Sequence, residues 1–365
     1  MRIVHIITRS SLGGAQSVVI NLANQQIVDN EVYIISGTDG NAWEALLPEI
    51  KIIGIKQLKR SISFWDIVVI FKLLYYRFSL KPDIVHLHSS KIGVLGRLCF
   101  SKKKIIYTVH GFDTIRIANK TFLWLEKLLK KRANKIVAVS QYDLKNLENN
   151  NIKNNVCCIY NGIEDNTQQT KVLSAPIADK IQSIKTRFRH LIICIARTEY
   201  PKRLDLFLDV AREMPDDAFV WIGNDQNFNS QLPHNTFLLG SIPHASLYIR
   251  YTDIFILPSD FEGLPMSIIE ALSYGKPVVA SNVGGITELI ADKNGFVVEN
   301  NPEQFVKRIS ELSSNSQLYT KMSIQARQAY EDLFTVSQMA NSYYTLYKKI
   351  YSRNKHPQKR LSTEI

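Results

Sequence analysis

Residues 258–281, PSDFEGLPMSIIEALSYGKPVVAS, restrict the possible folds more than any other stretch of the chain. They follow the short apolar run 253–257, which is typical of a buried parallel strand that the next proline ends. The apolar positions within 266–274 do not alternate as they would in a strand, and Gly275 and Pro277 close a predicted helix. A buried strand followed directly by a helix predicts an α/β fold.

Two acidic residues of this stretch, Glu262 and Glu270, are the main candidates for function. Glu262 is expected in the loop at the carboxyl end of the strand, and Glu270 in the helix. A helical rise of roughly 1.5 Å per residue separates them by on the order of 10 Å, which suits the two ends of a nucleoside diphosphate. Glu262 would accept hydrogen bonds from a sugar hydroxyl, Glu270 would bind a ribose diol, and the helix start would bind the phosphates. The alternative is two solvated surface acids.

Length and composition indicate a globular protein of two domains. The chain has 365 residues, of which 45% are hydrophobic. It contains no run of eighteen uncharged apolar residues and no signal-peptide cleavage site near its start, so we expect neither a membrane span nor a signal peptide. The four cysteines show no C-x-x-C spacing, which favours a reducing cytoplasm. Without a D-x-D pair or an H-E-x-x-H motif, we expect no dedicated metal site and no cofactor.

The positive charge is concentrated in the first half of the chain. Residues 1–172 hold 24 Lys and Arg against 13 Asp and Glu, whereas residues 173–365 hold 21 against 20, so the first half carries +11 of the net +12. Such a half could bind nucleic acid, an anionic membrane surface or a phosphate-bearing substrate. No nucleic-acid-binding motif accompanies the charge, so we expect no nucleic-acid partner.

Ligand contacts in the first half are expected where its predicted strands end. The strand 2–7 leads into a helix that starts near Gly13 and Gly14, whose N–H groups could meet a ligand or merely form a turn. The pattern is not G-x-G-x-x-G, which argues against a dinucleotide site. His110 follows another predicted strand, and the carboxyl ends of parallel strands are where ligands bind. His110 is therefore a candidate contact to a ligand.

The predicted helix 64–78 is rich in aromatic and aliphatic residues and carries Lys72 and Arg77. It could rest on a membrane surface or pack on the sheet, and we favour packing on the sheet. Further basic residues nearby keep a peripheral membrane role open: Lys56, Lys59, Arg60, Lys102, Lys103 and Lys104.

The second half resumes the alternation of strand and helix. The strand 191–196 is followed by Arg197 and Lys202, two cations that could neutralise charge on a departing diphosphate, although such a pair alone is more often surface charge. The strand 219–223 ends in Gly223, which either lets a nucleotide approach or makes a turn. Residues 166–186 lose the apolar periodicity and are expected to form a linker.

These motifs resemble one family. E-G-L-P with a second Glu after seven residues, the following A-L-S-Y-G-K-P-V-V-A and the later G-G-I-x-E-L-I resemble the E-x7-E signature of the retaining glycosyltransferases of the GT-B fold. A-R-T-E-Y-P-K-R is similar to the family's G-R-x-x-x-x-K-G element, with Ala196 and Arg203 in place of the glycines. H-x-H-S-S-K followed by T-V-H-G-F resembles members that assemble bacterial surface polysaccharides.

The resemblance implies an α/β protein with two Rossmann-like domains of parallel sheets that face each other across a cleft. Residues 1–165 would bind the acceptor, 166–186 would link the domains, 187–335 would bind the nucleotide-sugar, and 336–365 would form a helix that crosses back to the first domain, followed by a basic tail.

The resemblance also implies the reaction. A UDP-sugar would donate its sugar to a polyprenyl-diphosphate-linked glycan in O-antigen or capsule synthesis. The transfer would retain the configuration of the sugar. The expected catalytic residues are Glu262, His110, Arg197 and Lys202. The expected donor-binding residues are Gly13, Gly14, Arg197, Lys202, Gly223, Gly263, Leu264, Pro265 and Glu270.

The expected location is the cytoplasm, peripheral on the anionic inner-membrane surface. Three alternatives remain at this point: a nucleotide-sugar epimerase of the same fold, a protein that binds nucleotide-sugars without turnover, and a basic nucleic-acid binder. Product analysis separates the first, because an epimerase needs no acceptor.

Overall fold

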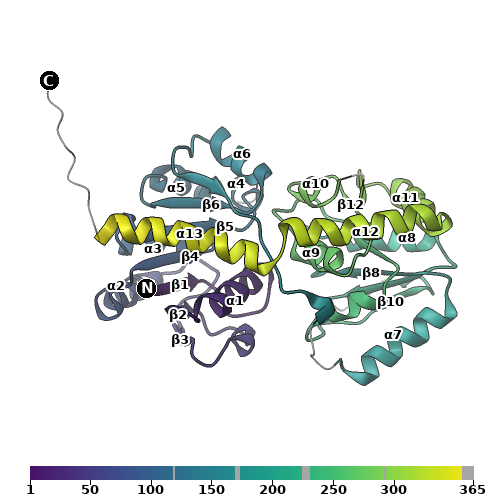
Figure 1. Cartoon of the computed structure of the whole chain (residues 1–365), viewed down its shortest axis with the longest axis horizontal. Coiled ribbons are helices and arrows are strands. Elements are labelled where there is room, and N and C mark those ends of the chain that lie inside the picture. The colour runs from purple at the N-terminus through teal and green to yellow at the C-terminus, as the bar shows by residue number, and fades with distance from the viewer. Residues whose placement is uncertain (118–119, 169–172, 224–230, 292, 356–365) are drawn as a thin grey trace. The chain divides into compact units, whose positions relative to one another are not determined.

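The chain forms two compact units. The computed structural model describes residues 1–117, 120–168, 173–223, 231–291 and 293–355. Unit 1 comprises Met1–Gly162 together with Val336–Ile365, and unit 2 comprises Ile163–Thr335 (Figure 1). Each unit is built on a parallel sheet with helices on its faces. The chain therefore passes between the units twice, at residues 162–163 and at residues 335–336.

Unit 1 contains a seven-stranded sheet in the order β3-β2-β1-β4-β5-β6-β7. All of its strand pairs are parallel. The strands are β1 Arg2–Ile7, β2 Glu31–Ser36, β3 Lys51–Gly54, β4 Ile84–His88, β5 Ile105–Val109, β6 Lys135–Ala138 and β7 Val156–Cys158. The order reverses between β1 and β4, and in sheets of this kind ligands bind beyond the carboxyl ends of the strands at such a point.

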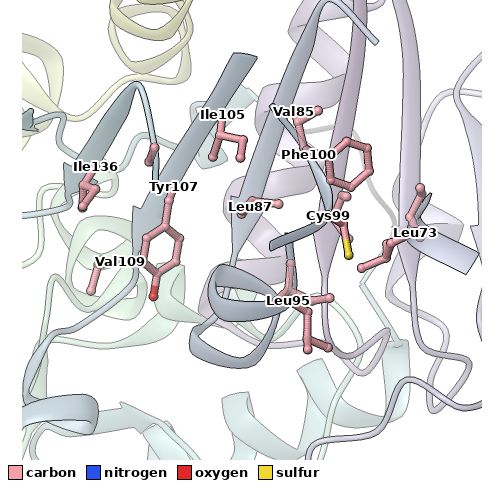
Figure 2. Packing of buried hydrophobic residues seen from close by; sticks show 14 of the residues in the cluster. Leu73, Val85, Leu87, Leu95, Cys99, Phe100, Ile105, Tyr107, Val109 and Ile136 are labelled. Carbon is pink, nitrogen blue, oxygen red and sulfur yellow. The ribbon is translucent and has the colours of Figure 1, made fainter. Parts of the chain in front are cut away.

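The helices of unit 1 pack on the two faces of this sheet. They are α1 Gly14–Gln26, α2 Asp66–Leu80, α3 Ser90–Cys99, α4 Asp113–Arg116, α5 Lys120–Leu129, α6 Gln141–Asn149 and α13 Val336–Lys355. Alternation along β4 assigns the faces: Val85 and Leu87 enter the apolar core that includes Leu73 and Leu95 of α2 and α3 (Figure 2), whereas His86 contacts α13. At β4, one face of the sheet is therefore apolar, and the other carries a polar layer.

Unit 2 contains a six-stranded parallel sheet in the order β10-β9-β8-β11-β12-β13. Its strands are β8 Leu191–Ile195, β9 Ala218–Ile222, β10 Thr236–Leu238, β11 Ile254–Leu257, β12 Val278–Ser281 and β13 Gly295–Val298. Its helices are α7 Ala175–Arg187, α8 Leu204–Glu213, α9 Met266–Ser273, α10 Ile286–Leu289, α11 Pro302–Ser314 and α12 Ser316–Leu333. The strand order reverses between β8 and β11, which directs attention to the loops that follow these two strands.

The expected linker over residues 166–186 is wrong for its second half. Helix α7 occupies that part, and Ile181 and Ile184 are buried in the core of unit 2 beside Leu191 and Val220. A few apolar residues among many polar ones were enough to anchor the helix to the sheet. Residues 169–172 of the expected linker lie outside the described residues.

Candidate functional site

The loop between β11 and α9 is fixed from both sides. The Ser259 N–H donates to Ser281 Oγ at the end of β12 (2.8 Å), and Asn300 Nδ2 donates to the Ser259 carbonyl (3.0 Å). An isolated antiparallel bridge joins Ser259 to Lys202. These contacts place the loop that carries Glu262 next to the segment that follows β8.

A glycine supports the backbone of Glu262. Gly284 has φ +57°, and a Cβ added there would lie 1.8 Å from the Glu262 carbonyl oxygen. The next residue, Gly285, donates its N–H to the Gly263 carbonyl (3.1 Å). Because only glycine permits both the left-handed backbone and this approach, the G-G pair holds the Glu262 loop in place. Sequence reasoning used this pair only as part of a motif and missed its steric role.

The structure brings Lys202 and Glu262 together. Lys202 Nζ forms an ion pair with Glu262 Oε1, although the residues are 60 positions apart in the sequence. Their side chains keep 15% and 12% of their surface exposed, so solvent and ligands can reach both charges. A ligand phosphate could therefore take the place of Glu262 beside Lys202, or a ligand hydroxyl the place of Lys202 beside Glu262. The displaced side chain would remain in contact with solvent or ligand.

The two arginines of the A-R-T-E-Y-P-K-R segment differ in their contacts. Arg197 follows β8, is exposed and makes no ion pair within the part of the chain that the structure describes. Arg203 pairs with Asp205 and with Asp260 of the β11 loop, and these two carboxylates raise the pKa of its guanidinium. Arg197 is thus available to an anionic ligand, whereas Arg203 braces the loop.

Glu270 lies on α9 and is half-buried. Desolvation raises the pKa of its carboxyl to about 7. Across the described ranges, no side chain forms a hydrogen bond or ion pair with this carboxylate. A carboxylate in this condition would be stabilised by donors that a ligand brings, such as the two hydroxyls of a ribose.

The start of α9 follows the segment Gly263, Leu264 and Pro265. Pro265 is the N-cap, and the first amide to bond within the helix is Ile268, which donates to the Pro265 carbonyl (3.2 Å). The amides of Met266 and Ser267 precede that bond and have no partner within the helix. Leu264 is buried and holds the segment against the core. Donor contacts of Gly263, Leu264 and Pro265 stay a prediction.

Gly223 is required by packing. A Cβ on it would lie 1.8 Å from the Ala196 carbonyl oxygen, which already accepts a hydrogen bond from Trp221 Nε1 (2.8 Å). The glycine therefore lets the end of β9 pass close to the end of β8. A contact between Gly223 and the nucleotide stays a prediction.

In unit 1, Gly13 and Gly14 are exposed at the start of α1. Gly13 has an extended backbone, with φ −176° and ψ 174°. The preceding loop is fixed by Asp39, which accepts hydrogen bonds from the Ser10 N–H (2.8 Å) and Arg9 Nε (2.7 Å). The two glycines thus lie open at the carboxyl end of β1, as expected, and their contact with a ligand is untested.

His110 ends a chain of hydrogen-bonded imidazoles. Its Nε2 lies 3.1 Å from Nδ1 of His88, whose Nε2 lies 3.0 Å from Nδ1 of His5, whose Nε2 lies 2.8 Å from Oε1 of Gln26. With the Gln26 oxygen toward His5, each ring is neutral and donates from Nε2 to the next acceptor. Burial lowers the pKa of His110 to about 4. At neutral pH His110 would therefore offer an uncharged Nδ1 to a hydroxyl.

Sequence reasoning singled out His110 but missed the residues behind it. His5 lies in the first strand and Gln26 at the end of the first helix, and nothing local relates them to His88. The available signal was the position of His86 and His88 two apart on a strand, which places both on one face.

Three of these histidines come close enough to hold a metal ion, since one nitrogen each from His5, His86 and His88 lie within 4.8 Å of one another. Yet the ring nitrogens of His86 already contact Tyr347 Oη and Thr108 Oγ1, and those of His5 and His88 belong to the chain above. We therefore assign the group to the hydrogen-bonded layer beneath α13.

Two family models match the chain, one in each unit. The model for glycosyl transferases group 1 matches residues 178–329, and the model for glycosyltransferase family 4 matches residues 12–167. The first match contains the Lys202 and Glu262 pair and Glu270. The second contains Gln26, His88 and His110 of the imidazole chain, whereas His5 precedes the matched residues.

Known proteins are similar over most of their length. A UDP-Gal:alpha-D-GlcNAc-diphosphoundecaprenol alpha-1,3-galactosyltransferase of Escherichia coli is 27% identical over 354 residues, covering 87% of this chain and 89% of that protein. The O-antigen biosynthesis glycosyltransferase WbnH of Escherichia coli is 26% identical over 348 residues, covering 93% and 96%. The crystal structure of Anabaena Alr3699/HepE in complex with UDP-glucose matches with a TM-score of 0.82 at 19% identity, covering 96% and 100%. This last likeness shows the fold.

Proposed function

We propose a reaction for this chain, which belongs to the GT-B glycosyltransferases of the group 1 and family 4 type. In this reaction the protein transfers a sugar from a UDP-sugar to a polyprenyl-diphosphate-linked glycan in bacterial surface-polysaccharide synthesis. The observation that carries this proposal is the reachable ion pair between Lys202, which follows β8, and Glu262. Glu262 lies in the same β11–α9 segment as the carboxyl of Glu270. Cations and carboxylates in this arrangement suit a ligand that has both phosphates and hydroxyls.

The donor and acceptor classes come from the relatives. The name of one bacterial relative specifies UDP-galactose as donor and a diphosphoundecaprenol-linked sugar as acceptor. The excess of Lys and Arg in residues 1–172 is consistent with an acceptor that carries phosphates. We assign the donor to unit 2 and the acceptor to unit 1.

In the proposed reaction, Lys202 and Arg197 neutralise the charge that grows on the leaving diphosphate, together with the amides at the start of α9. Glu262 accepts hydrogen bonds from hydroxyls of the transferred sugar, and Glu270 binds the ribose diol. The bond between the sugar C1 and the diphosphate oxygen breaks while the acceptor oxygen bonds to C1 on the same face. The acceptor proton passes to the departing diphosphate, so the configuration at C1 is retained.

The acceptor hydroxyl would be positioned in unit 1 by His110. Its pKa of about 4 keeps the imidazole neutral, so it can accept a hydrogen bond from the acceptor hydroxyl. A neutral ring also carries no positive charge that would bind a phosphate in place of the hydroxyl. The open glycines at the start of α1 would leave room for the glycan to approach.

The test is a transfer assay on the purified protein. UDP-glucose, UDP-galactose, UDP-N-acetylglucosamine, GDP-mannose and dTDP-sugars are each incubated with and without a short polyprenyl-diphosphate-linked sugar. Products are identified by mass spectrometry and the new linkage by NMR. We expect one UDP-sugar to give an α-linked product only with the lipid acceptor. A changed sugar-nucleotide without acceptor would identify an epimerase, and binding without any product would identify a non-catalytic protein; either outcome contradicts the proposal.

A further inference from the structure

Helix α2 of unit 1 presents an aromatic stripe to solvent. Ile67, Phe71, Tyr75 and Phe78 are between 57% and 67% exposed, and Phe64, just before the helix, is 72% exposed. The spacing of three and four residues places the four helical residues on one side of α2. The opposite side is buried through Val69 and Leu73, which pack on the sheet. The packing on the sheet that the sequence favoured is therefore confirmed for the buried side, whereas a membrane contact of the exposed side stays a prediction.

Neighbouring helices extend the stripe. Helix α3 packs against both α2 and α5, so the three helices form one layer on the sheet. On α5, Trp124 and Leu128 are each 62% exposed, and the exposed Lys127 lies on the same side at helical spacing. The exposed Lys131 follows in the turn after the helix. Leu98 at the end of α3 is 51% exposed. We call the exposed residues of α2, α3 and α5 the apolar layer. Isolated exposed apolar residues are ordinary, but a set gathered on adjacent helices marks an interaction surface.

The charge around the apolar layer is strongly positive. Residues 56–132, which include all three helices, hold 17 Lys and Arg and only 4 Asp and Glu. Three of the four acids are already paired with a basic residue: Asp66 with Lys91, Asp113 with Arg116, and Glu126 with Arg97. The remaining field attracts anions, which distinguishes this surface from a simple apolar patch.

We propose that the apolar layer docks unit 1 onto the surface of an anionic lipid bilayer, with the aromatic stripe in the headgroup region and the lysines against the lipid phosphates. Aromatic residues on one side of a helix, with Lys and Arg beside them, are the composition of helices that lie in a membrane interface. Basic residues near an anionic bilayer add electrostatic attraction to its surface. Within the described part of the chain, no helix is long and apolar enough to cross a membrane, so docking of this kind would be peripheral.

The position of the segment before α2 connects membrane docking with binding of the lipid-linked acceptor, an argument that rests on the proposed function. Strand β3 ends at Gly54, so the segment that precedes α2 lies at the carboxyl end of the sheet, the end where His110 follows β5. The exposed residues Ile62, Phe64 and Trp65 are therefore at the ligand-binding end of unit 1. A polyprenyl chain could remain in the bilayer while its diphosphate and sugars reach that end.

The experiment measures vesicle binding without any donor or acceptor. The purified full-length protein is co-sedimented with vesicles of phosphatidylcholine, or of phosphatidylcholine mixed with phosphatidylglycerol. We expect binding to the anionic vesicles only, with release at high salt. The triple variant Phe71→Ser, Tyr75→Ser, Phe78→Ser on α2 and the double variant Lys127→Glu, Lys131→Glu should each lose about tenfold or more in partitioning.

A matched control replaces two residues that are equally exposed but lie on α12 of unit 2, Ile324→Ser and Leu333→Ser. It should bind as the unchanged protein does, and thermal melting should show that all variants fold. Unchanged binding by the α2 variant would overturn the proposal. So would a lack of vesicle binding combined with an α2-dependent dimer in sedimentation equilibrium, which would assign the layer to a second copy of the chain.

The failure of this proposal and of the proposed function can be distinguished. The α2 variant should retain transfer to a short, water-soluble diphosphate-linked acceptor, because its substitutions lie outside the catalytic machinery. Vesicle binding without transfer to any acceptor would leave the docking surface intact and contradict the proposed reaction. Transfer without vesicle binding would do the reverse.

Discussion

The two units each contain a buried or partly buried ion pair, and the pairs differ in what can reach them. In unit 1, Arg97 and Glu126 lie 2.7 Å apart with 0% and 2% of their side chains exposed, and Tyr107 also donates to Glu126 (3.1 Å). In unit 2, Lys202 and Glu262 keep 15% and 12% exposed. The comparison suggests a division of roles: the sealed pair serves the fold, and the reachable pair serves a ligand.

The largest effect should follow from breaking the sealed pair. Arg97→Met would leave the Glu126 carboxylate in an apolar interior without its cation, which costs about 3–5 kcal/mol of unfolding free energy. Denaturation in urea measures the loss. Lys127→Met, at an exposed position of α5 next to Glu126, is the matched control and should change little. A loss below about 1 kcal/mol would show that the pair is not the structural element described.

Glu262→Gln should have the opposite effect, with a large loss of transfer activity and little loss of stability. The amide keeps the size of the side chain but loses the charge that accepts the sugar hydroxyl and pairs with Lys202, so we expect transfer to fall by about 100- to 1,000-fold. UDP affinity should change only a few-fold, and thermal stability should stay close to that of the unchanged protein. Glu303→Gln, an exposed acid at the start of α11, is the control. Full activity in Glu262→Gln would remove the argument for the site.

The units should also respond oppositely to pH. Burial lowers the pKa of His5 and His110 to about 4, below the value of about 6.5 in an unfolded chain. Between these values the unfolded state binds protons that the folded state does not, so stability falls as pH falls through that window, by about 1.4 kcal/mol per pH unit for each histidine. The protection factors of the β4 and β5 amides in hydrogen exchange, which correct for the slower intrinsic exchange in acid, should fall from pH 6.5 to 4. Protection factors that stay constant in this window would contradict the neutral imidazole chain.

Glu270 gives the smallest and opposite effect. Because desolvation raises the pKa of its carboxyl to about 7, the folded state holds a proton that the unfolded state releases above its ordinary value of 4.5. Glu270 therefore costs unit 2 stability increasingly as pH rises from 4.5 to 7. Glu270→Gln should stabilise the protein by about 1–2 kcal/mol at pH 8 and hardly at pH 4. The same substitution should weaken the binding of UDP. Equal gains at both pH values would show that the carboxyl is not the cause.

Local sequence patterns predicted the elements well where a strand is buried on both faces. The runs that became β1, β8 and β11 are short, apolar and closed by turn residues, so their structure depends little on distant contacts. The two glutamates were found for the same reason, since their spacing along one loop and helix is a local property. The linker interpretation failed because the burial of Ile181 and Ile184 depends on the sheet and not on neighbours in sequence.

The contacts that sequence could not supply join distant segments. The pairing of Lys202 with Glu262 and the steric need for Gly223 and Gly284 arise only after the strands are in order. The two sides of α2 were also indistinguishable in sequence, because Phe71 and Leu73 are both apolar although one is exposed and the other buried. Which apolar residue is buried is decided by packing.

The central claim is that Lys202, the cation of the reachable ion pair of unit 2, binds the diphosphate of the nucleotide. Calorimetric titration of UDP into the unchanged protein, Lys202→Ala and the exposed control Lys321→Ala tests it most directly. Loss of a charge-assisted contact to phosphate should lower the affinity for UDP about 10- to 100-fold in Lys202→Ala and leave the affinity of the control unchanged. Equal UDP affinity in all three proteins, or no binding by the unchanged protein, would contradict the claim.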